Sequence, residues 1–95
     1  MKEKSHNYHT LLEKYNGAAF SDMNNDDLRL IKKGMGLPAT KQLYYRHKLC
    51  NKLVREIVIE GIYKPFYMCR LYVTTEDGKQ YKVLSEYFAE MQRKK

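Results

Sequence analysis

The sequence predicts an α+β domain in which three N-terminal helices precede a β-hairpin and a short C-terminal helix. Apolar residues recur at helical spacing in the first half of the chain. The apolar pattern changes to a strand-like alternation after residue 62, and Asp77-Gly78 is the strongest hairpin signal in the chain. With 95 residues, the chain is expected to form one compact domain, residues 1–95.

Two helices are predicted before residue 37. The first runs over about residues 5–15 and ends at Gly17, because glycine accepts the left-handed conformation found after helices. Asn24 or Asn25 is expected to cap the second helix, which carries acidic residues in its first turn and is ended by Gly34 and Gly36.

The third and longest helix is predicted over residues 39–57, with Pro38 in its first turn. At about 100° per residue, this helix has an apolar stripe and a cationic stripe on opposite sides. The apolar stripe is Leu43, His47, Cys50, Val54 and Ile57. The cationic stripe is Lys41, Tyr45, Lys48, Lys52 and Arg55.

The hairpin and the last helix follow. Phe66 to Val73 and Tyr81 to Leu84 are predicted as the two strands, because aromatic and β-branched residues concentrate there. Ser85 is expected to cap the C-terminal helix.

The basic residues are concentrated in one stretch. Residues 28–55 hold eight Lys or Arg and no Asp or Glu, whereas the whole chain has a net charge of +7. The rest of the chain therefore sums to −1. Cations spaced along a rigid element release counterions from phosphates, so the sequence predicts a non-enzymatic nucleic-acid-binding protein. A solvated helix face is the alternative, since most charge runs are no more than that.

Residues 24–84 share their predicted order of elements with a known class of DNA-binding domains. The helix that begins Ala39-Thr40-Lys41-Gln42-Leu43-Tyr44-Tyr45 follows a turn at Gly36, and this pair resembles a helix-turn-helix unit. The hairpin behind it resembles the wing of winged-helix proteins. The resemblance implies that the second helix enters the major groove of duplex DNA and that the hairpin is an accessory contact. An ordinary helical hairpin stays the alternative.

The predicted nucleic-acid-binding residues come from the basic stretch, the start of the third helix and the hairpin. They are Lys32, Lys33, Thr40, Lys41, Gln42, Tyr44, Tyr45, Lys48, Lys52, Arg55, Lys79 and Lys82. DNA is expected ahead of RNA as the target. The sequence indicates no particular binding site on either.

Other functions have little support in the sequence. Neither a phosphate-binding glycine loop nor a catalytic signature is present, so no catalytic residue and no cofactor are predicted. His47 and Cys50 are expected to line the core and not to bind a metal, and Cys50 and Cys69 are expected to be free thiols. No apolar run approaches the roughly 20 residues that span a bilayer, and no secretory signal is visible, so a cytoplasmic location without membrane contact is expected.

A protein partner is the competing hypothesis. Small tyrosine-rich domains without catalytic motifs also act as inhibitors or adaptors, as some phage and plasmid proteins do. Such a protein docks its basic face or the edge of its hairpin on a host protein or a nucleoprotein complex. Pairing of two copies through the hairpin to form a homodimer is also left open.

Overall fold

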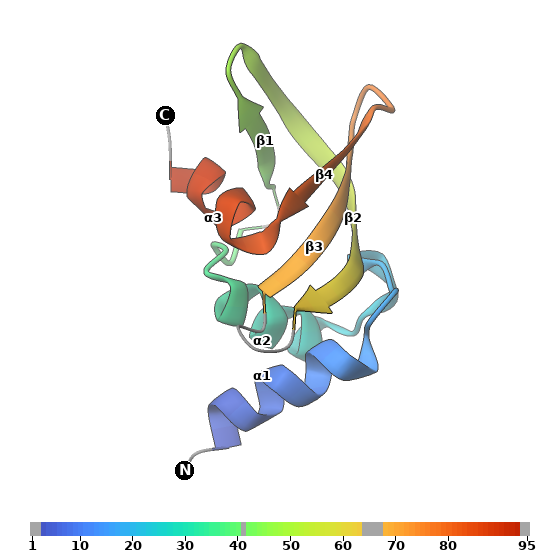
Figure 1. Cartoon of the computed structure of the whole chain (residues 1–95), viewed down its shortest axis with the longest axis vertical. Helices are drawn as coiled ribbons and strands as arrows, with labels where there is room; N and C mark the ends of the chain where they lie inside the picture. Colours follow the sequence, from blue (N-terminus) through green and yellow to red (C-terminus); the bar gives the residue numbers. More distant parts are fainter. Residues whose placement is uncertain (1–2, 41, 64–67, 94–95) are drawn as a thin grey trace.

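The computed structural model describes residues 3–40, 42–63 and 68–93 (Figure 1). Two helices come first, an antiparallel sheet of four strands follows, and a third helix ends the described chain. The helical elements are α1 (Glu3–Lys14), the 3-10 turn η1 (Phe20–Asp22), α2 (Asn25–Met35) and α3 (Ser85–Arg93). The strands are β1 (Tyr44–His47), β2 (Cys50–Tyr63), β3 (Met68–Thr75) and β4 (Gln80–Leu84), which lie side by side in chain order.

The predicted order of three N-terminal helices, a hairpin and a C-terminal helix is wrong. Residues 39–57, expected to form the third helix, contain β1 and the first half of β2. Two helices therefore precede a four-stranded sheet and one follows it, in a mixed α+β fold. Because the third helix does not exist, the winged-helix-like order and the expectation of a helix in the major groove are also wrong.

The residues of the predicted apolar stripe do share one face, but it is a face of the sheet. In β1 and β2, side chains alternate between the two faces, and the turn at Lys48-Leu49 separates the strands. A bulge between Val54 and Glu56 then shifts the alternation by one residue. Counted across the turn and the bulge, the stripe residues are separated by steps of three and four, which imitates the period of a helix, although Tyr45 and Lys52 between them also face inward.

The predicted start of α2 at Asn24 and its end at Gly36 are confirmed, whereas Gly34, also expected to end the helix, lies inside it. Asn24 caps the helix, with its side-chain oxygen accepting a hydrogen bond of 2.8 Å from the backbone N–H of Asp27. Gly36 ends the helix in the left-handed conformation, at φ 83°. Position 34 lies inside the helix, and the ring of Tyr8 passes so close to it that only glycine fits. A Cβ built on Gly34 would lie 2.2 Å from that ring.

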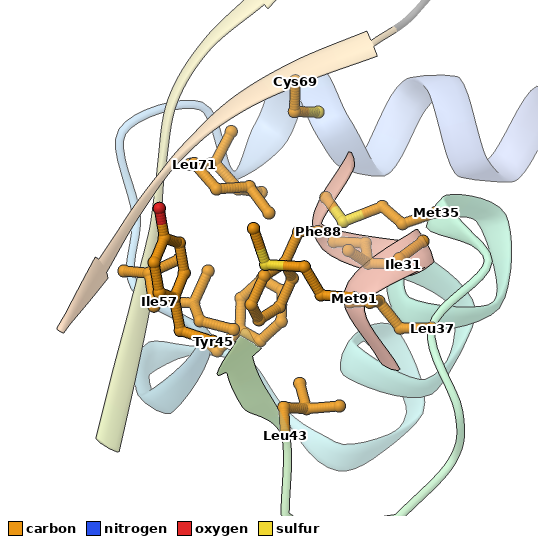
Figure 2. Close-up of a cluster of buried hydrophobic side chains, with 14 of the residues drawn as sticks. Ile31, Met35, Leu37, Leu43, Tyr45, Ile57, Cys69, Leu71, Phe88 and Met91 are labelled. Carbon is orange, nitrogen blue, oxygen red and sulfur yellow. The ribbon is translucent and has the colours of Figure 1, made fainter. Parts of the chain in front are cut away.

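The core lies between the inner face of the sheet and the helices (Figure 2). Phe88 of α3 is fully buried and lies between Ile31 of α2 and Leu71 of β3. The predicted alternation in β3 is confirmed, since Cys69, Leu71 and Val73 are all buried. Residues 66 and 67 of the predicted strand lie outside the described residues.

Residues 17–19 cover part of one edge of β2. Gly17 N–H donates to Ile59 C=O over 2.7 Å, and Ile59 N–H donates to Ala18 C=O over 3.0 Å. Ala19 forms a bridge to Val58. This segment continues along the same edge as β1, so the long strand β2 has partners on both sides.

Helix α3 is hydrogen-bonded to the edge of β1, and the sheet is curled (Figure 1). The Gln92 side chain accepts a hydrogen bond of 2.9 Å from Tyr44 N–H and donates one of 2.7 Å to Tyr44 C=O. The amide group thus imitates a neighbouring strand at the edge of β1. Because the sheet is curled, the rings of Tyr45 on β1 and Tyr81 on β4 stack with their centroids 4.2 Å apart.

Ser85 does not act as the predicted cap. It is the first residue of α3, and its hydroxyl accepts a hydrogen bond of 3.1 Å from Cys69 N–H. The side chain therefore joins the start of α3 to β3 in the buried part of the protein.

Candidate nucleic-acid interface

The hairpin of β1 and β2 projects from the body of the protein, at the opposite end from α1 (Figure 1). Its outer face carries the residues that alternate away from the core. They are Tyr44 and Arg46 on β1, and Asn51, Leu53 and Arg55 on β2. Residues 42–55 contain four cations and no Asp or Glu. We call this face, together with the turn Lys48-Leu49, the basic ribbon.

The turn at the end of the basic ribbon has two unusual properties. Lys48 has φ 55°, a left-handed conformation that two-residue hairpin turns usually assign to glycine or asparagine. Leu49 is fully exposed, with a relative exposure of 102%. A hairpin thus presents a large apolar side chain to solvent beside an exposed lysine.

Arg46 is held in a defined position on the basic ribbon. Its Nη1 donates to Met91 C=O over 3.0 Å, and its Nε donates to Asn51 Oδ1 over 3.1 Å. The guanidinium also lies over the ring of Tyr44, 4.8 Å from the centroid. These contacts orient the arginine, which was absent from the predicted set.

Two predicted site residues point to the inner face instead. Tyr45 is buried against Tyr81, and burial raises the pKa of its hydroxyl. The ammonium of Lys52 forms an ion pair with Asp77 on the β3–β4 turn. The hydrogen bond between them raises the pKa of Lys52 and, with a second hydrogen bond from Thr75, holds the pKa of Asp77 well below its usual range. The charge of Lys52 is therefore compensated within the protein.

The predicted residues nearest α2 are separate from the basic ribbon. Lys32 donates to Thr40 C=O over 2.7 Å, and burial lowers the pKa of its ammonium. Lys33 is exposed on α2, and Gln42 is exposed in the segment before β1. Lys41 lies outside the described residues.

The predicted residues of the second hairpin also lie apart. Lys79 is exposed next to the β3–β4 turn. Lys82 lies 3.6 Å from Glu60 and 6.0 Å from the ring centroid of Tyr72, across the outer face of the sheet. The single cationic stripe predicted from the sequence is therefore wrong. Of its described residues, only Lys48 and Arg55 share a surface, to which Tyr44 also belongs.

A groove lies beside the basic ribbon, between β1, β4 and α3. It has a volume of about 510 Å³, within the range of about 300–1,000 Å³ that is common for ligand sites. We call it the edge groove. It is lined by Tyr45, Arg46, His47, Lys48, Lys82, Val83, Leu84, Tyr87, Glu90 and Met91.

Cys50 and Cys69 are free thiols, and burial raises the pKa of Cys69 to about 11. Within residues 3–40, 42–63 and 68–93, no three His, Cys, Asp or Glu side chains come together as metal ligands would. None of the helices described is both long enough and apolar enough to span a bilayer.

Comparison of the chain with protein-family models, with curated protein sequences and with solved structures found no match.

Proposed function

We propose that this protein binds nucleic acid, with duplex DNA as the first expected target, through the basic ribbon. The observation that supports the proposal is the charge of this surface. Arg46 and Arg55 lie on the outer face of a projecting hairpin, Lys48 lies in its turn, and residues 42–55 include no acid. Cations on a rigid element gain free energy by displacing counterions from phosphates.

The dimensions of the hairpin suit a nucleic-acid groove. A two-stranded β-ribbon fits the major groove of B-DNA, which is about 12 Å wide. Lys48 and Arg55 are seven residues apart, so an extended strand separates them by at most about 23 Å. This span covers several phosphates along one DNA strand.

The residues of the basic ribbon have different roles in the proposal. Lys48 and Arg55 contact phosphates and position the domain. Arg46, which is oriented by Asn51 and Met91, presents a planar guanidinium to a phosphate or a guanine edge. Leu49 makes the apolar contact at the end of the hairpin, against a thymine methyl group or a base step.

The test is a titration of the full chain into fluorescent DNA, followed by anisotropy. The probes are a duplex of about 20 base pairs and its separate strands, in about 50 mM salt. The double variant Lys48→Ala/Arg55→Ala is expected to bind the duplex at least about tenfold more weakly, or about 1.4 kcal/mol. Leu49→Ala is expected to weaken binding without changing the charge.

The matched control removes the same charges elsewhere. Lys33→Ala/Arg29→Ala changes two exposed cations on α2, and it is expected to bind within about twofold of the wild type. Equal losses in the two double variants mean that net charge alone attracts the DNA, which contradicts the proposed surface. Absence of binding to every probe contradicts the function itself.

A further inference from the structure

Among the described residues, strand β4 is an edge of the sheet, since it pairs there with β3 on one side only. The hydrogen bond of 2.9 Å from Thr75 N–H to Lys79 C=O fixes which residues of β4 bond to β3. From there the pattern alternates, so Tyr81 and Val83 exchange hydrogen bonds with β3. The backbone groups of Gln80 and Lys82 therefore point away from β3.

This open edge borders the edge groove. Lys82, Val83 and Leu84 form one wall, and Arg46 and Lys48 belong to the opposite wall. A strand added beside β4 would place alternate side chains in the groove, on the face of the sheet to which Val83 points. Three other residues of the groove offer apolar surface to those side chains: Tyr45, Tyr87 and Met91.

The charges of the edge groove favour an acidic segment. Arg46 and Lys48 lie on the β1 side, and Glu90 is the one acidic residue in the lining. The ammonium of Lys82 is directed to Glu60 on the outer face, so Lys82 contributes its backbone and not its charge to the groove. A segment with apolar residues at alternate positions and carboxylates toward β1 matches both walls.

We propose that the edge groove binds an extended, acidic peptide segment of a partner protein, which adds to the sheet as a fifth strand beside β4. This interaction surface goes beyond the proposed nucleic-acid binding and does not depend on it. The two surfaces share Arg46 and Lys48 but face different directions, with the basic ribbon outward and the groove toward α3.

The test begins with peptides displayed on phage, as a random linear library of about ten residues selected against the immobilised full chain. A synthetic copy of an enriched peptide is then titrated by anisotropy. Lys82→Pro removes the outward N–H of β4 and is expected to weaken binding at least about tenfold, whereas Lys82→Ala keeps that N–H and stays within about twofold.

A second measurement uses the unchanged protein. Methylation of single peptide nitrogens is expected to weaken binding at every second position, because alternate N–H groups face β4. Three results would each overturn the proposal: no enriched peptide, equal losses in the two Lys82 variants, or methylation effects without alternation. Displacement of the peptide by a single-stranded DNA of about 20 nucleotides, undiminished in Arg55→Ala, which changes the basic ribbon alone, would assign the groove to nucleic acid instead. Failure of the DNA titrations alone leaves the peptide result standing, so the two proposals fail separately.

Discussion

Replacing Gln92 with alanine should lower the free energy of unfolding by about 2 kcal/mol. The side chain makes three hydrogen bonds: it accepts one from Tyr44 N–H, donates one to Tyr44 C=O and donates one to Phe88 C=O over 2.9 Å. Each such bond contributes about 0.5–1.5 kcal/mol net. Because the site is only half-buried, water replaces part of the loss, which places the expected cost below the upper sum.

The assay is urea unfolding followed by circular dichroism, with thermal melting in parallel. A loss of about 2 kcal/mol corresponds to a fall in Tm of about 8–16 °C for a domain of this size. Gln92→Glu should not rescue stability, because a carboxylate cannot donate to the carbonyls of Tyr44 and Phe88. Arg93→Ala, an exposed neighbour on α3, serves as the control and is expected to stay within about 0.5 kcal/mol. A Gln92→Ala protein as stable as this control would refute the role of Gln92 as a substitute strand at β1.

Three further outcomes are expected. Gly34→Ala should destabilise the protein, although this change usually stabilises a helix, because the new Cβ would meet the Tyr8 ring at 2.2 Å; a melting temperature above that of the wild type would contradict this packing. Asp77→Asn should lower the free energy of unfolding at neutral pH, and the difference from the wild type should shrink as pH falls below about 4, because the pKa of Asp77 is depressed in the folded state and its stabilising charge is lost when the carboxylate is protonated. A difference that does not change with pH would contradict the ion pair. Ellman's reagent at mildly alkaline pH should modify half-exposed Cys50 first and Cys69 only on unfolding, and equal rates in the native protein would contradict the burial of Cys69.

Local signals predicted the limits of several elements correctly. The Asn24 cap and the left-handed Gly36 of α2 depend on the chemistry of single residues, and such chemistry is visible in a sequence. The turn at Asp77-Gly78 has the same character, with Gly78 at φ 86°. These features needed no knowledge of distant contacts.

The sequence predicts a helix over residues 39–57 wrongly, because the strand alternation of this segment is interrupted by a turn and a bulge. The inward residues are Leu43, Tyr45 and His47 before the turn, Cys50, Lys52 and Val54 after it, and Ile57 beyond the bulge. The turn Lys48-Leu49 lacks the glycine or asparagine that signals a hairpin, so nothing local marked the reversal of the chain. Pairing with β3 and the contacts of α3 decide this region, and both come from residues far along the sequence.

The candidate site was predicted only in part for the same reason. The charge count and the proposed surface agree on Lys48 and Arg55, which both belong to the basic ribbon. Assigning them to a helix placed Lys52 and Tyr45 beside them, whereas strand alternation turns both inward. Alternation along residues 44–46 and 51–55 would have identified Arg46 on the same face as Arg55.

The salt dependence of duplex binding tests the proposed function most directly. Two phosphate contacts from Lys48 and Arg55, at about 0.9 each, predict a slope of about −1.8 for the logarithm of the binding constant against the logarithm of salt concentration. The slope should fall to about −0.9 in Lys48→Ala and stay unchanged in Lys33→Ala. A wild-type slope near zero, or equal slopes in the two variants, would contradict binding through the hairpin of β1 and β2.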